Sequence, residues 1–179
     1  MTALIIYNMP DYKLVKERAE KEIVPIIEQI GYEVVEVAFK KEYDYDTLTF
    51  FIWKSGGITL DDCEAVNNAL DIPLEENDIT NGAPYTLNIS SPGLDRAIIT
   101  NDDYRRNLDL ELEAIFLKQV DRKKKISGFL REYDENFVTL ESKGKKVKLD
   151  RHNIKSLKQL IKFGGHGQKW WQTKVFSKH

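Results

Sequence analysis

The sequence contains a single cysteine, Cys63, which excludes an internal disulfide and a zinc site built mainly from cysteines. No run of about 18 apolar residues is present, so no membrane-spanning helix is expected. The apolar residues 4–7 lack the basic start and the length of a signal peptide. Together these absences predict a cytoplasmic protein that does not bind a membrane.

Residues that could build a catalytic or metal centre are also scarce. There are three histidines, His152, His166 and His179, and no His-x-x-His or Cys-x-x-Cys pair. Cys63 falls on the apolar side of a predicted helix, where a small core residue is commoner than a nucleophile. Residues 54–57 are glycine-rich but match neither a P-loop nor the Gly-x-x-Gly clamp of RNA-binding KH domains. We predict no catalytic residue, no cofactor and no metal; a hydrolase or redox enzyme that depends on Cys63 or His152 is the alternative.

Charge is abundant and unevenly distributed, although the net charge is only −2. Residues 1–90 contain 7 Lys and Arg against 17 Asp and Glu, a difference of −10. Residues 91–179 contain 20 against 12, a difference of +8. With 41% hydrophobic residues to form cores, this reversal predicts two domains with different surfaces and different partners.

The first half begins with an amphipathic pattern at residues 11–30, which predicts a helix with a kink or break at Pro25. Residues 32–39 alternate apolar and polar side chains, and residues 47–53 are rich in β-branched and aromatic ones. These segments predict two antiparallel strands joined through a polar loop at residues 40–46.

A second helix is predicted to start at an N-cap formed by Thr59 and Asp62 and to end at Pro73. Residues 85–90 predict a third strand, and residues 3–7 a further edge strand. The order helix, strand, strand, helix, strand (αββαβ) is typical of ferredoxin-like and KH-like α+β domains.

The second half is predicted to be almost entirely β-structure after a short helix capped by Thr100 and ending at Arg106. Five strands are expected, at residues 108–117, 125–133, 137–142, 145–149 and near 155–160, with turns at 121–124, 134–136 and 143–144. Short strands at this spacing favour a small SH3-like or Sm-like barrel.

We therefore divide the chain into an acidic α+β domain (1–91), a basic barrel (92–162) and a C-terminal tail (163–179). The tail combines several glycines with Trp170 and Trp171, whose side chains are costly to leave in water. It is expected either to fold back onto a domain or to dock on a partner.

Two groups of cations lie on predicted hairpins of the barrel. They are Arg122, Lys123, Lys124 and Lys125 in one group and Lys143, Lys145, Lys146 and Lys148 in the other. On one side of a compact barrel they would suit an rRNA backbone, with a steep salt dependence and little base specificity. The alternative is that these lysines keep the strand edges soluble and unpaired.

The boundary between the halves carries the most specific motif of the sequence. Pro92 and Gly93 stand where a type II turn needs a fixed φ and a positive φ. An adjacent acid and base follow, so that the motif reads Ser90, Ser91, Pro92, Gly93, Leu94, Asp95 and Arg96. We assign Asp95 and Arg96 first to fixing the domain junction through turn geometry and an ion pair.

This motif resembles the signature of the ribosome maturation factor RimP family, with departures at Asn88, Ile89 and Ala97. Residues 57–66 resemble the start of that family's second helix, and residues 126–130 resemble a strand of its barrel. The resemblance implies a non-enzymatic factor, acting as a monomer in late assembly of the small (30S) ribosomal subunit. It would bind immature subunits and help small-subunit ribosomal protein twelve and nearby rRNA to dock. A freestanding Sm-like RNA-binding module is the alternative function.

Overall fold

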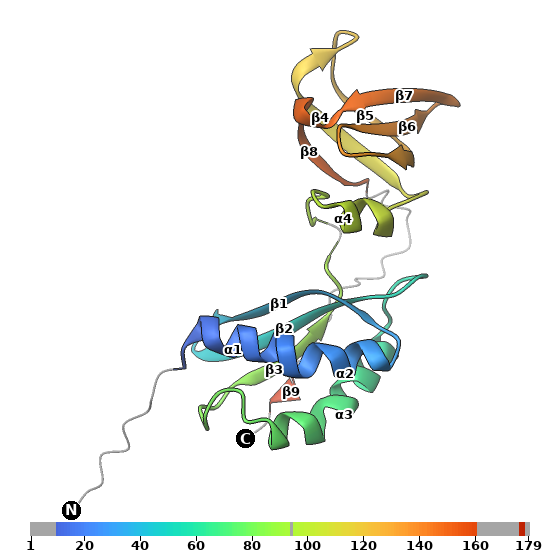
Figure 1. Cartoon of the computed structure of the whole chain (residues 1–179). Helices are drawn as coiled ribbons and strands as arrows, with labels where there is room; N and C mark the ends of the chain where they lie inside the picture. The colour runs from blue at the N-terminus through green and yellow to red at the C-terminus, as the bar shows by residue number, and fades with distance from the viewer. Residues whose placement is uncertain (1–9, 94, 161–175, 178–179) are drawn as a thin grey trace, which may run out of the picture. The chain divides into compact units, whose positions relative to one another are not determined.

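The computed structural model of the 179-residue chain describes residues 10–93, 95–160 and 176–177 (Figure 1). The chain divides into two compact units, one made of residues 1–92 with 169–179 and the other of residues 93–168. Each unit has its own hydrophobic core. The strand predicted at residues 3–7 and most of the tail lie outside the described residues.

The first helical segment is interrupted where the sequence places its proline. It consists of α1 (Tyr12–Arg18), a π-helical stretch (Ala19–Ile23) and α2 (Val24–Gln29), and Asp11 caps its start. Pro25 has no N–H to donate, and the widened π-helical turn directly before it accommodates the missing bond. The predicted irregularity at Pro25 is therefore confirmed.

The sheet of the first unit has the strand order β1-β2-β3-β9. Its members are β1 (Glu33–Glu42), β2 (Tyr45–Trp53), β3 (Thr86–Ser90) and the two-residue β9 (Phe176–Ser177). β2 is antiparallel to β1 and parallel to β3, and β9 is antiparallel to β3. The predicted loop at 40–46 is wrong, because the β1–β2 ladder continues through it and leaves a two-residue turn.

The second helix, α3 (Leu60–Glu76), begins with a capping box formed by Thr59 and Asp62, as predicted. Its predicted end at Pro73 is wrong, because the helix continues for almost another turn. The backbone N–H and the side-chain amide of Asn77 both donate to the carbonyl of Pro73. A proline this close to the C-terminus removes one helical bond, and the following turn remains capped.

Asp62 is a buried carboxylate that accepts hydrogen bonds from three residues. The donors are the backbone and hydroxyl of Thr59 at 2.8 and 2.7 Å, Lys54 Nζ at 2.7 Å and Tyr32 Oη at 2.8 Å. Burial alone would raise the pKa of Asp62, but these donors hold it well below its ordinary value. The carboxylate thereby joins the start of α3 to the end of β2 and the beginning of β1.

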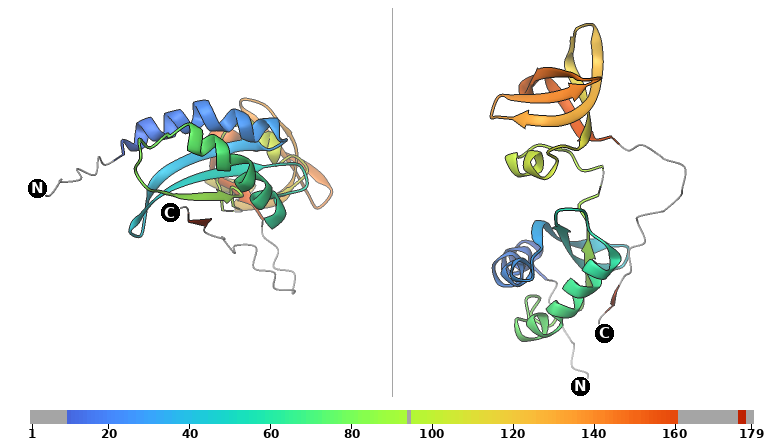
Figure 2. Two further views of the ribbon diagram at one scale, coloured as in Figure 1. Left: turned by 90° about the horizontal axis from the view of Figure 1, so that it is seen from below. Right: turned by 90° about the vertical axis from the view of Figure 1, so that its right-hand side faces the viewer.

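The α1–α2 segment and α3 lie on one face of the sheet (Figure 2). Alternate residues of β2 point into the core on this face, and the side chains of Leu48, Phe50 and Ile52 have no exposed surface. They belong to one cluster with buried residues of both helical segments, including Ile23, Ile27, Val66 and Leu70. The predicted αββαβ order and α+β class of this region are confirmed.

In its described residues, the second unit has a short helix followed by a five-stranded antiparallel sheet. The helix α4 (Asn101–Arg106) starts at a capping box formed by Thr100 and Asp103. The strands are β4 (Glu111–Val120), β5 (Lys123–Tyr133), β6 (Phe137–Ser142), β7 (Lys145–Asp150) and β8 (Ile154–Gln159), with a 3-10 turn (Arg151–Asn153) before the last. Their order is β7-β6-β5-β4-β8, and the described residues show no pairing of β7 with β8 that would close a barrel.

Gly128, in the middle of β5, allows a close approach of two strands. A Cβ atom at this position would lie 2.5 Å from the backbone oxygen of Glu141 in β6, a distance that no side chain tolerates. Leu130 and Leu140, paired next to it, are fully buried in the core of this unit. The glycine therefore has a packing role in the sheet.

Candidate nucleic-acid interface

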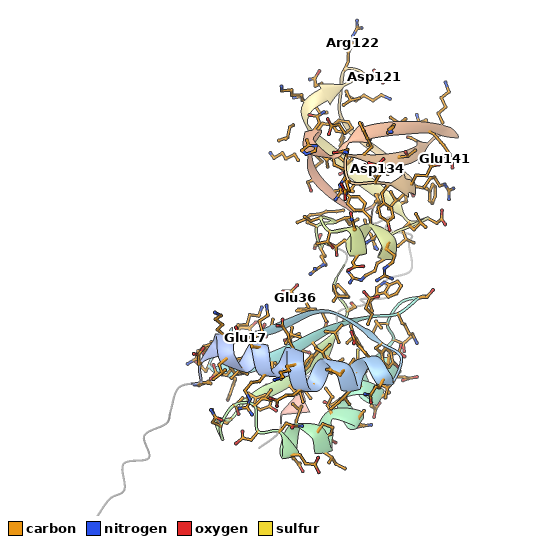
Figure 3. All side chains as sticks on the ribbon, viewed as in Figure 1. Glu17, Glu36, Asp121, Arg122, Asp134 and Glu141 are labelled. Carbon is orange, nitrogen blue, oxygen red and sulfur yellow. The ribbon has the colours of Figure 1, made fainter. Side chains whose placement is uncertain are left out.

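The first group of predicted cations lies on a projecting hairpin. Asp121 and Arg122 both have positive φ, of 50° and 62°, and form the two-residue turn that joins Val120 to its partner Lys123. Below the turn the ladder is irregular, because residues 116–119 of β4 stand opposite Lys124 alone. Figure 3 shows Asp121 and Arg122 at the end of this hairpin, which we name the hairpin arm (residues 117–125).

The cations of the hairpin arm are not equivalent. Arg122, Lys123 and Lys124 are exposed, and no carboxylate among the described residues pairs with them. Lys125 is different, because its Nζ lies 2.7 Å from Glu113 Oε2 on the neighbouring strand. Three cations at the tip are therefore available for phosphate oxygens without the loss of an ion pair, and the fourth is not.

The second group shows the same division. Lys143 and Lys145 flank Gly144 at the β6–β7 turn, are exposed and have no carboxylate partner in the part of the chain described. Lys146 Nζ lies 2.6 Å from Glu132 Oε1, and its hydrogen bond lowers the pKa of that carboxyl group. Lys148 Nζ lies 4.1 Å above the ring of Phe137, in a cation–π contact.

The two groups of cations lie at the same end of the sheet but at different positions along the strand direction. β5 starts and β6 ends at this end, because the strands are antiparallel and Phe129 pairs with Glu141. The β6–β7 turn therefore lies near residue 128 of β5, about 20 Å short of the tip at Arg122 for six residue steps of extended chain. By this register the eight cations form two groups rather than one patch. Figure 3 shows Arg122 well apart from Glu141, which lies next to the β6–β7 turn.

Lys118 also belongs to this region, although the sequence alone did not identify it as part of the site. Lys118 lies on β4 at the base of the hairpin arm with an exposed side chain. Its backbone N–H donates to Asn153 Oδ1 and its carbonyl accepts from Asn153 Nδ2, both at 2.8 Å. A carboxamide has the donor and acceptor of a peptide group, so Asn153 continues the β4–β8 ladder where β8 has not yet begun. Lys118 adds a cation to the arm, and Asn153 anchors its base.

The described residues of the junction motif have a structural role. Ser90 ends β3 and Gly93 has φ +78°, as the predicted type II turn requires, while Leu94 lies outside the described residues. Asp95 is exposed. Arg96 Nε lies 3.5 Å from Oδ1 of Asp103, the capping residue of α4.

Asp103 in turn accepts hydrogen bonds from Thr100, from the backbone of Ile99 and from Arg106. Burial would raise the pKa of Asp103, and the hydrogen bonds from Thr100 and Ile99, together with the charge of Arg96, lower it. Arg96 therefore helps to hold the chain that enters the second unit against α4.

Nothing at Cys63 suggests catalysis. The side chain packs against the core of the first unit, and burial raises the pKa of its thiol, which disfavours a reactive thiolate. His152 lies on the exposed 3-10 turn, with Nδ1 3.1 Å from Asp150 Oδ1. Across the described ranges, no three His, Cys, Asp or Glu side chains come close enough to hold a metal ion.

Comparison with protein families identifies the first unit. The RimP N-terminal domain matches residues 22–95, which extend from the π-helical stretch through α3 and β3 to the junction motif. No helix in the described part of the chain is both long and apolar enough to cross a membrane. RimP proteins are ribosome maturation factors that catalyse no reaction. Over residues 22–95 the chain therefore matches the RimP N-terminal domain, and its junction motif from Ser90 to Arg96 resembles that family's signature.

Proposed function

We propose that this protein acts in the cytoplasm as a monomeric assembly factor for the small (30S) ribosomal subunit. It binds immature subunits and helps small-subunit ribosomal protein twelve and the nearby rRNA to reach their native positions. The match of residues 22–95 to the RimP N-terminal domain supports a role in ribosome maturation. The observation that carries the contact with RNA is the set of unpaired cations at the tip of the hairpin arm, Arg122, Lys123 and Lys124.

The charge distribution supports a division of labour between the two halves of the chain. The acidic half, with an excess of ten negative charges before residue 91, suits a basic ribosomal protein. The basic half suits rRNA, because cations that neutralise phosphates release counterions. The factor would leave once the ribosomal protein and the rRNA pair with each other.

For the domain organisation we propose an acidic domain at residues 1–91, a basic SH3-like barrel at 92–162 and a tail at 163–179. Four consecutive strands form a meander, and β8 returns after the 3-10 turn to pair with β4. This order supports a small SH3-like barrel. The two-residue strand β9, paired with β3, supports a tail whose end folds back onto the first unit.

Sedimentation of cell lysate through a sucrose gradient, with the protein detected by antibody, tests the proposal. We expect comigration with free small subunits and absence from translating ribosomes. Comigration with translating ribosomes, or with no ribosomal particle, would contradict it. A freestanding Sm-like module would instead elute as a ring of several copies in gel filtration and bind short RNA without subunits.

A further inference from the structure

The edge of the first sheet at β3 differs from the other sheet edges of the molecule. β1 carries five charged residues and a register shift, β7 carries three lysines and β8 carries two. Charged side chains and irregular pairing prevent edge strands from pairing with other chains. β3, with the sequence Thr-Leu-Asn-Ile-Ser, has no charge, no proline and no register shift. Among the described strands at or next to a sheet edge, β3 alone has neither form of protection and is longer than two residues.

The chain itself occupies part of this edge. β9 pairs antiparallel with Thr86 and Leu87, the first two residues of β3. Asn88, Ile89 and Ser90 pair with β2, and no strand among the described residues pairs with them on the outer side. The edge therefore accepts an added antiparallel strand, and more than half of its length is left for a longer one.

The surroundings of β3 favour a positively charged occupant. α3 packs directly against β3. This helix contains no Lys or Arg, and besides the buried Asp62, which pairs with Lys54, it has five acidic residues, Asp61, Glu64, Asp71, Glu75 and Glu76. An extended segment added at β3 would run beside this acidic helix, so lysine or arginine side chains would be attracted and carboxylates repelled.

We propose that the β3 edge is a docking site for an extended, Lys- or Arg-rich protein segment, which pairs antiparallel with residues 86–90 and displaces β9. Added strands bind through main-chain hydrogen bonds, and their alternate side chains give specificity. This proposal rests on the proposed function in one respect: both have the protein bind a basic protein segment. It does not involve the hairpin arm.

β9 acts in this scheme as a resident competitor. Its two residues match two positions of β3, whereas an incoming segment can use all five. The apparent affinity of the segment falls with the fraction of molecules in which β9 occupies the edge. Weakening β9 must therefore tighten binding of the segment, which a contact elsewhere on the protein would not do.

The test uses the full-length protein and a fluorescent peptide of about ten residues that alternates lysine with valine, long enough to span a typical strand. A peptide with glutamate in place of lysine is the matched control. We expect saturable binding of the lysine peptide by fluorescence anisotropy, with slower hydrogen exchange at the amides of residues 86–90. The glutamate peptide should not bind at the same ionic strength.

The competition is tested with the double variant Phe176→Pro/Ser177→Pro, because two prolines remove both backbone donors of β9. The control, Phe176→Ala/Ser177→Ala, keeps them. The proline variant should bind the lysine peptide about two- to tenfold more tightly than the alanine variant, the range expected when one or two backbone hydrogen bonds of a competitor are lost.

Three results would overturn the proposal: equal affinity for the two peptides, protection outside residues 86–90, or equal affinity of the proline and alanine variants. A doubled mass in sedimentation would show that the edge binds a second copy instead. The peptide measurements need no ribosomes, so failure of the proposed function in the gradient experiment would leave them unaffected.

Discussion

Neutralising the three unpaired cations of the hairpin arm, as Arg122→Gln/Lys123→Gln/Lys124→Gln, should flatten the salt dependence of binding to immature small subunits. Each phosphate neutralised contributes about 0.7 to 0.9 to the slope of log K against log salt concentration. Three contacts therefore predict a slope reduced by about 2 to 3. The magnitude follows from the structure, because these side chains are exposed and, within the described residues, have no carboxylate partner to give up.

The assay is the association constant of fluorescently labelled protein with purified immature subunits, measured between about 50 and 200 mM salt, where phosphate contacts dominate the change in affinity. The matched control, Lys13→Gln/Lys16→Gln/Lys40→Gln, removes the same charge from lysines of the first unit that pair with glutamates. It should leave the slope unchanged. An unchanged slope in the arm variant would refute the reasoning, and an equal fall in both variants would show that only net charge matters.

Asp62→Asn should lower the free energy of unfolding by about 2–3 kcal/mol, because it removes a buried charged acceptor that has several hydrogen-bond donors. The control, Asp61→Asn, changes an exposed residue of the same helical turn and should lower the free energy of unfolding by less than about 1 kcal/mol. The folded state lowers the pKa of Asp62, so the stabilisation by its carboxylate is complete above the unfolded pKa and is lost as the pH falls. In urea unfolding, the difference in unfolding free energy between the wild type and Asp62→Asn should therefore narrow below about pH 4. A difference that stays constant with pH would show that the ionised carboxylate of Asp62 is not its cause. Gly128→Ala should destabilise the second unit by about 1–3 kcal/mol, because the added Cβ clashes with the backbone of Glu141. The control, Ser127→Ala, should destabilise it by about 0.5 kcal/mol or less, and thermal unfolding measures both. Equal effects of the two variants would show that the strands can move apart at little cost.

Most individual elements could be predicted because their causes are local. Thr59 and Thr100 each precede an aspartate by three residues, and both form capping boxes. Lys143 and Gly144 mark a turn that the structure contains, and residues 137–142 form a strand with the predicted ends. Two of the local errors also have local reasons: a ladder extended across a polar segment at 40–46, and a helix that passes Pro73 because its final turn is capped by Asn77.

The candidate site could be predicted only as a list of cations. The sequence places Lys124 and Lys125 side by side, but only the register of β4 against β5 brings Glu113 to Lys125 and, among the residues that the structure describes, no acid to Lys124. Lys146 of β7 likewise pairs with Glu132 of β5, which lies on the other side of β6. Which cations are available to a phosphate is therefore a property of strand pairing.

By itself, the sequence determined the family motif, the opposite charges of the two halves and the type and order of nearly all the helices and strands, because caps, turns and alternation act over a few neighbouring residues. Only the tertiary structure decided that β3 runs parallel to β2, that β9 pairs with β3 and that β8 pairs with β4. These contacts join segments that are not neighbours in the sequence. They depend on which strands and side chains packing brings together, which no local pattern of residues specifies.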